Sequence, residues 1–177
     1  ASPGQDIHPV FAPDGSRLLF SSNRGNADPD DFDLYTMAID GTDVQRLTEG
    51  PYVDTYASYS PDGSRIVTRR VVGGNSEVFV LNADGTDPVN LSNSPAYDGW
   101  PVWAPDGRRI AFAGGEPGGQ VGLFLINPDG SGLVRLTSDP ATEDRHPAFS
   151  PNGQHLAFTR YRPGTAESSD IMVLRVP

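Results

Sequence analysis

The stretch "HPVFAPDGSRLLF", residues 8–20, decides the fold. It reads as a short apolar strand, a Pro-Asp-Gly turn and a second apolar strand. Proline presets φ at the first central position of such a turn, aspartate supplies a side-chain hydrogen bond, and glycine tolerates the positive φ that follows. The stretch therefore predicts a β-hairpin.

The hairpin recurs four times along the chain. Its turns lie at 13–15, 61–63, 105–107 and 151–153, spaced by 48, 44 and 46 residues. An aromatic residue stands two positions before each turn proline, and we expect these four residues in the core: Phe11, Tyr59, Trp103 and Phe149. A third strand and a short fourth strand follow each hairpin, except that the last unit ends at its third strand. A four-stranded unit with a period of 40–50 residues predicts a propeller blade.

The fold class predicted is therefore all-β, a β-propeller of four tandem blades in a single domain over 1–177. The blades span about 6–50, 51–93, 94–138 and 139–177, and the last lacks its outer strand. Its third strand, Ile171 to Arg175, would leave an open sheet edge. Three arrangements fit: a small closed ring, a partial propeller cut from a larger one, or a half that forms a homodimer through its open edges.

Charge and composition exclude several classes of partner. The 177 residues carry a formal net charge of -10, with no cysteine and no long apolar run. An acidic protein repels nucleic acid phosphates and anionic membrane surfaces, and it attracts basic partners. We therefore expect no nucleic acid partner, no membrane span and no disulfide or thiolate metal site.

The repeats resemble a known family. The segments "HPVFAPDGSRLLFSSNRG" and "DLYTMAIDGTDVQRLT" are similar to the PD-type, WD-repeat-like unit of TolB, which is also found in the propellers of some serine peptidases. The likeness extends over about residues 6–176. It implies a protein or peptide partner and a periplasmic or extracellular location in a bacterium.

An aspartate stands seven residues before each turn proline: Asp6, Asp54, Asp98 and Asp144. Equivalent positions of a ring converge on its axis, so these carboxylates would form an acidic channel mouth. Their repulsion would be relieved by protonation, by backbone hydrogen bonds or by a cation with oxygen ligands. Ca²⁺ is an example of such a cation and the candidate cofactor that the sequence suggests. Alternatively, each aspartate caps a turn between blades.

A second set stands two residues after the aspartates: His8, Tyr56, Trp100 and His146. Being in register, these side chains should lie at the same mouth, and Tyr52 and Tyr97 lie in loops on that side. Exposed aromatic residues on a rigid scaffold are typical of binding surfaces, and the two histidines are of the type that ligates transition metals. The alternative is that all six side chains pack between blades.

The sequence contains no recognisable catalytic motif: no G-x-S-x-G elbow, H-E-x-x-H, P-loop or dinucleotide fingerprint. We therefore predict a non-catalytic binding scaffold that presents an acidic channel-mouth face to a protein or peptide partner. The alternative is an enzyme. It would be a metal-dependent lyase or hydrolase built on His8, His146 and the aspartates, or the propeller portion of a larger peptidase.

Overall fold

The computed structural model describes residues 4–115, 119–162, 164 and 168–177. This part of the chain contains strands and turns and no helix, and therefore no helix able to cross a membrane. The strands form four antiparallel sheets, each built from consecutive segments of the chain. The fold is all-β, as the repeats predict.

The strand order within each sheet follows the chain. Sheet 1 contains β1 (Asp6–Phe11), β2 (Arg17–Ser22), β3 (Asp33–Ala38) and β4 (Gln45–Arg46). Sheet 2 contains β5 (Tyr52–Tyr59), β6 (Arg65–Val72), β7 (Asn75–Asn82) and β8 (Val89–Asn90). Sheet 3 contains β9 (Asp98–Trp103), β10 (Ile110–Gly114), β11 (Gly122–Ile126) and β12 (Val134–Arg135). Sheet 4 contains β13 (Glu143–Phe149), β14 (His155–Tyr161) and β15 (Ser169–Arg175).

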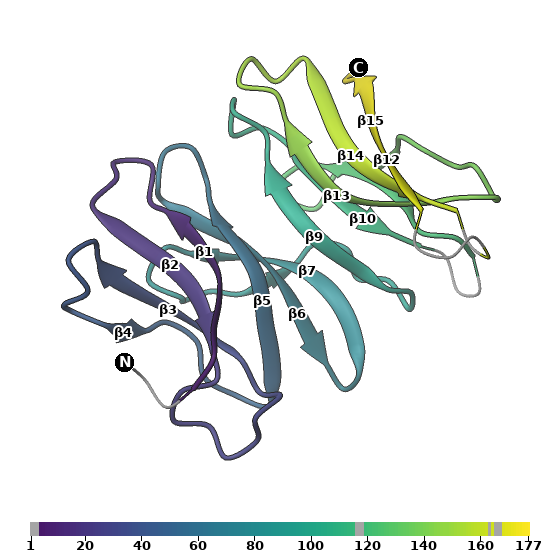
Figure 1. Ribbon diagram of the computed structural model, residues 1–177. Helices are drawn as coiled ribbons and strands as arrows, with labels where there is room; N and C mark the ends of the chain where they lie inside the picture. Colours follow the sequence, from purple (N-terminus) through teal and green to yellow (C-terminus); the bar gives the residue numbers. More distant parts are fainter. Residues whose placement is uncertain (1–3, 116–118, 163, 165–167) are drawn as a thin grey trace.

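The sheets stand side by side like the blades of a propeller, with sheets 1 and 4 at opposite ends of an open arc (Figure 1). Each sheet packs face to face on the next through an apolar seam. Leu19 and Leu34 of sheet 1 contact Ile66 and Leu81 of sheet 2 in the first seam. The second seam, between sheets 2 and 3, and the third, between sheets 3 and 4, are built in the same way. Burial of these aliphatic side chains holds the arc together.

Sheet 4 has three strands in the described part of the chain, and β15 is its edge, as predicted. The face of sheet 4 that points away from sheet 3 is open, and Ile171 and Val173 on it are 74% and 62% exposed. Their repeat equivalents in sheet 2, Val78 and Val80, are buried in the second seam. The exposure follows from position in the array, because no sheet in the described part of the chain packs on this face.

One core prediction is wrong for the same reason. Trp103 is buried, and Tyr59 and Phe149 are half-buried against the first and third seams. Phe11, however, is 68% exposed. It lies on the face of sheet 1 that points away from sheet 2, where a preceding blade would have to stand to cover it.

Candidate functional site

Each sheet places its first strand on the inner side of the arc, and each of these strands carries a β-bulge at the same position. The register shifts lie at His8, Tyr56, Trp100 and His146. All four residues have φ between 49° and 54°. Such left-handed backbone costs a bulky residue about 1–2 kcal/mol, and a bulge re-aims the side chain that it carries. The repeat thus turns four rings toward the inner side of the arc.

The four rings form an unbroken row along the inner wall. Ring centroids are 3.9 Å apart for His8 and Tyr56, 5.8 Å for Tyr56 and Trp100, and 4.7 Å for Trp100 and His146. Tyr97 joins the row from the side, 5.3 Å from Trp100. We call these five residues the aromatic row. Four of them meet as their common register predicts, and Tyr97 adds to them from a neighbouring position. Four of them, without Tyr97, line a shallow hollow of about 310 Å³.

Two guanidinium groups flank the aromatic row. Arg69 lies over Tyr97 at 5.5 Å and Arg145 lies over Trp100 at 5.4 Å. Burial, and then the charge of Arg69, lowers the pKa of His8. Burial and Arg145 lower the pKa of His146 in the same way. Both imidazoles are therefore held neutral at pH 7, and the positive charge near the row comes from arginine.

The two arginines differ in their partners, because Arg145 faces a carboxylate and Arg69 faces hydroxyl groups. Arg145 forms an ion pair with Glu143. Arg69 donates to Ser76 Oγ at 2.7 Å and to Thr55 Oγ1 at 3.1 Å, and it has no carboxylate partner among the described residues. Hydroxyls orient its guanidinium but leave its charge uncompensated.

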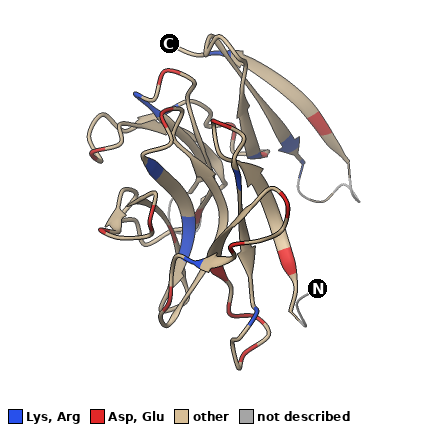
Figure 2. Cartoon of the chain, turned by 90° about the vertical axis from the view of Figure 1, so that its left-hand side faces the viewer, with Lys and Arg blue, Asp and Glu red and all other residues tan. Residues whose placement is uncertain are grey.

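The predicted acidic mouth does not form, because the aspartates are bound within their own sheets. Arg70 pairs with Asp54 and Arg160 with Asp144, directly across the first and second strands of their sheets. Arg24 pairs with Asp6 in sheet 1. Among the described residues, no three histidine or acidic side chains gather closely enough to hold a metal. The prediction that Asp6, Asp54, Asp98 and Asp144 share a cation is therefore wrong, and acidic residues are spread over the molecule (Figure 2).

Asp98 is the exception in its surroundings. Gly114 lies opposite Asp98 on the neighbouring strand β10. In each of the other three sheets, an arginine pairs with the corresponding aspartate. Asp98 is 3% exposed, and its Oδ2 has no hydrogen-bond partner among the described residues. Burial, together with the nearby Glu77 carboxylate, raises the pKa of Asp98 to about 7.

Tyr52 lies apart from the aromatic row. Its ring packs under the guanidinium of Arg70 at 4.3 Å. It also lines a separate hollow of about 390 Å³ whose rim carries Asp28, Asp30 and Asp31. The expectation that Tyr52 joins the other aromatic residues at one mouth is therefore wrong.

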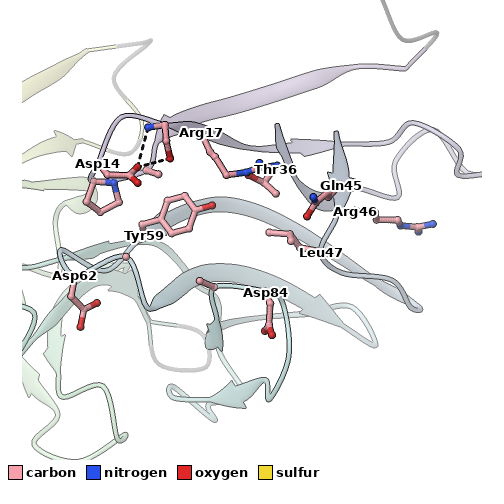
Figure 3. A pocket seen from close by; sticks show the side chains of 14 residues that line it. Asp14, Arg17, Thr36, Gln45, Arg46, Leu47, Tyr59, Asp62 and Asp84 are labelled. Carbon is pink, nitrogen blue, oxygen red and sulfur yellow. Dashed lines mark hydrogen bonds between the residues drawn. The ribbon is translucent and has the colours of Figure 1, made fainter. Parts of the chain in front are cut away.

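A further hollow of about 630 Å³ lies between sheets 1 and 2, with Tyr59 and Leu47 exposed to it (Figure 3). Three acids stand at its rim: Asp14, Asp62 and Asp84. Each accepts hydrogen bonds inside its own turn, for example from Ser16 to Asp14 at 2.7 Å. These bonds lower the pKa of all three carboxyls. The three carboxylates at the rim thus already have hydrogen-bond partners within their own turns.

The comparisons with known proteins agree with this architecture. The model of the TolB β-propeller domain matches residues 1–173. The chain belongs to the TolB β-propeller family. A TolB homolog of Chlorobium luteolum is 40% identical over 131 residues, which cover 74% of this chain and 29% of that protein. An uncharacterized peptidase of Bacillus subtilis, YuxL, is 28% identical over 161 residues, 91% of this chain and 22% of the peptidase.

The fold is also found among solved structures. A TolB structure from Agrobacterium tumefaciens superimposes with a TM-score of 0.82 at 20% identity, covering 99% of this chain and 65% of that one. At this identity the likeness concerns the fold alone. The chain spans less than a third of the length of these two curated relatives.

Proposed function

We propose that this TolB-family propeller is a non-catalytic binding scaffold whose aromatic row holds an extended segment of a partner protein. The observation that supports the proposal most directly is the continuity of the row, in which successive ring centroids lie 3.9–5.8 Å apart across all four sheets. A line of ring faces on a rigid wall fits the apolar and proline side chains of a bound peptide.

The charge beside the row favours an acidic segment. The sequence predicts a basic partner, but Asp6, Asp54 and Asp144 are each neutralised by arginine. Arg69, by contrast, has no carboxylate partner among the described residues. A carboxylate of the partner beside Arg69 would gain a charge-assisted hydrogen bond. We therefore expect the bound segment to combine apolar residues with an aspartate, a glutamate or a C-terminal carboxylate.

Fluorescence of Trp100 tests this proposal. Trp103 is the other tryptophan, so a Trp103→Phe background leaves Trp100 as the single reporter in the row. The probes are two capped peptides, Pro-Phe-Asp-Pro-Phe and Pro-Phe-Lys-Pro-Phe. We expect the aspartate peptide to bind more tightly and Arg69→Gln to remove its advantage. Equal binding of both peptides would contradict the acidic partner, and no binding of either would contradict the site.

The enzyme alternative has less support in the arrangement of side chains. It requires His8, His146 and the aspartates to gather, but Tyr56 and Trp100 stand between the two histidines and arginines hold three of the aspartates. A peptidase propeller is a second candidate, supported by the 28% identity to YuxL. Hydrolysis of peptide substrates by the protein would favour that candidate.

Location and self-association complete the proposal. A periplasmic or extracellular setting in a bacterium is the setting that membership of the TolB family supports.

We also propose that the open faces of sheets 1 and 4 pair with those of a second copy. The support is the internal packing of the array, in which the equivalents of Ile171 and Val173 are buried by the next sheet.

A further inference from the structure

Four positions are equivalent from one seam to the next, and in the first seam they hold two acids and two arginines. The acids stand at the start of the third strand of one sheet and of the first strand of the next. The arginines stand on the fourth and second strands of the same two sheets. In the first seam the four residues are Asp33, Asp54, Arg46 and Arg70. In the second seam the same positions hold Glu77, Asp98, Asn90 and Gly114, and in the third they hold Gly122, Asp144, Arg135 and Arg160.

Charges in the first seam balance. Arg46 Nη2 lies 2.6 Å from Asp33 Oδ2, and Arg70 Nη2 lies 2.7 Å from Asp54 Oδ2. Both aspartates are almost completely buried. A guanidinium therefore faces each of the two buried carboxylates and offsets the cost of burying it.

Both arginines are absent from the second seam, although both acids remain. Asn90 takes the place of Arg46, since the strand register pairs Asn90 with Phe79 and Arg46 with Tyr35. Gly114 takes the place of Arg70, since Gly114 pairs with Asp98 and Arg70 with Asp54. Glu77 is 6% exposed and Asp98 is 3% exposed. No ion pair reaches either acid from the described residues.

Hydrogen bonds reach both acids, but they leave one carboxylate oxygen of Asp98 without a partner among the described residues. Glu77 accepts from Asn75 Nδ2 at 2.6 Å, from Ser92 Oγ at 2.6 Å and from Ser94 N at 3.1 Å. The side chains of Ser92 and Ser94 also hydrogen-bond to Asp98, and these bonds lower its pKa, but burial outweighs them. A serine hydroxyl has one proton to donate, so Ser92 cannot donate to Glu77 and Asp98 at the same time. The Oδ2 atom of Asp98 has no partner in this part of the chain.

A buried pair of carboxylates without a counter-charge is costly. The raised pKa of Asp98, caused by burial and by Glu77, is the expected mark of such a site. An unpartnered carboxylate oxygen this deeply buried, beside a second carboxylate and two hydroxyls, supplies the oxygen ligands that a hard cation prefers.

We propose that the second seam binds a divalent hard cation of the Ca²⁺ type between Glu77 and Asp98, in the place that arginine takes in the first seam. The hydroxyls of Ser92 and Ser94 complete the oxygen set. The cation would join sheet 2 to sheet 3. This site is separate from the aromatic row, and the proposal does not depend on the binding function proposed above.

Thermal unfolding at pH 8 tests the proposal, with Ca²⁺ as the probe and EDTA as the reference. Ca²⁺ at a hundredfold excess over its Kd should raise the Tm of the wild-type protein by about 5–10 °C. The isosteric variants Glu77→Gln and Asp98→Asn should lose this response while unfolding at a higher Tm in EDTA. Asp144→Asn, the matched change in the third seam, should keep it.

A gain-of-charge variant provides the second measurement. Asn90→Arg restores the arginine that the fourth strand carries in the first seam and should remove the Ca²⁺ response. An unchanged wild-type Tm with Ca²⁺ and EDTA would overturn the proposal, as would a full response in Asp98→Asn. If the Tm instead rises on acidification from pH 8 to pH 6 without any response to Ca²⁺, a proton neutralises the pair and the proposal is also overturned.

Discussion

Arg70 holds Asp54 by two hydrogen bonds across β5 and β6, Nε to Oδ1 and Nη2 to Oδ2, each 2.7 Å long. Asp54 has no exposed surface, and the guanidinium of Arg70 is also stacked on Tyr52. Arg160 and Asp144 repeat the arrangement in sheet 4. A buried pair with this geometry fixes the start of an inner strand against its neighbour, and so positions the ring that follows two residues later.

Breaking this pair should cost much more stability than breaking its exposed counterpart. Arg70→Met leaves the Asp54 carboxylate buried without a partner, and we expect the free energy of unfolding to fall by about 3–5 kcal/mol. Arg24→Met removes the partner of Asp6, which remains 43% exposed, so the expected loss is below about 1 kcal/mol. Urea denaturation of the two variants measures the difference, and equal losses would contradict this account.

The left-handed backbone of the aromatic row makes a second prediction. His146 has a φ of 54°, and glycine and alanine both remove its ring contact with Trp100, so the difference between these two variants reports backbone strain. Glycine tolerates this conformation and alanine does not. His146→Gly should therefore be more stable than His146→Ala by about 1 kcal/mol.

The matched control for the backbone prediction is Thr159 in β14, which has ordinary extended backbone. At this position the alanine variant should be more stable than the glycine variant, because glycine weakens a strand. Chemical denaturation of the four variants gives the comparison. The same order at both positions would show that strain at His146 does not contribute.

The repeat made the sheets and the aromatic row predictable. Residues at equal offsets from a recurring turn occupy equivalent places in equivalent blades, so His8, Tyr56, Trp100 and His146 had to fall in register. Tyr52 lacked such an offset, and it lies elsewhere. Equal spacing predicts that side chains are equivalent, but it does not say which neighbour each one contacts.

The aspartates show this limit. Asp54 and Arg70 are 16 residues apart, as are Asp144 and Arg160, and this repeated spacing was the signal that each acid has a partner in its own sheet. Reading it requires the strand register as well as the strand positions. Phe11 shows a second limit, because its neighbours depend on a blade beyond the first repeat. Arg69 and Glu77 carried no motif, and only their contacts single them out.

The two histidines of the row should titrate below their ordinary range. Burial, followed by Arg69 for His8 and Arg145 for His146, lowers the pKa of each imidazole from 6.5. The unfolded chain therefore binds protons near pH 6.5 that the folded protein binds only at lower pH. Stability is full above pH 6.5 and falls as the pH drops toward the folded pKa values.

Proton NMR of the imidazole Hε1 signals tests the histidine prediction. Arg69→Gln should raise the pKa of His8 and leave that of His146 unchanged, and Arg145→Gln should do the opposite. The double variant His8→Asn with His146→Asn should lose less stability than the wild type between pH 7 and pH 5. If the arginine changes move neither pKa, the two guanidinium groups do not act on the row.

The open face of sheet 4 should drive self-association. Ile171 and Val173 are exposed where their equivalents Val78 and Val80 are buried by the next sheet, and burial of such side chains stabilises an interface by about 25 cal/mol per Å² of apolar surface. Sedimentation should therefore show a concentration-dependent dimer.

Ile171→Asp with Val173→Asp should shift the dimer to a monomer without unfolding the protein, because both side chains are exposed. Val134→Asp on the outer strand β12, at a site that is also exposed but lies outside the terminal face, should leave the dimer intact. A monomeric wild type, or equal effects of the two changes, would contradict pairing through this face.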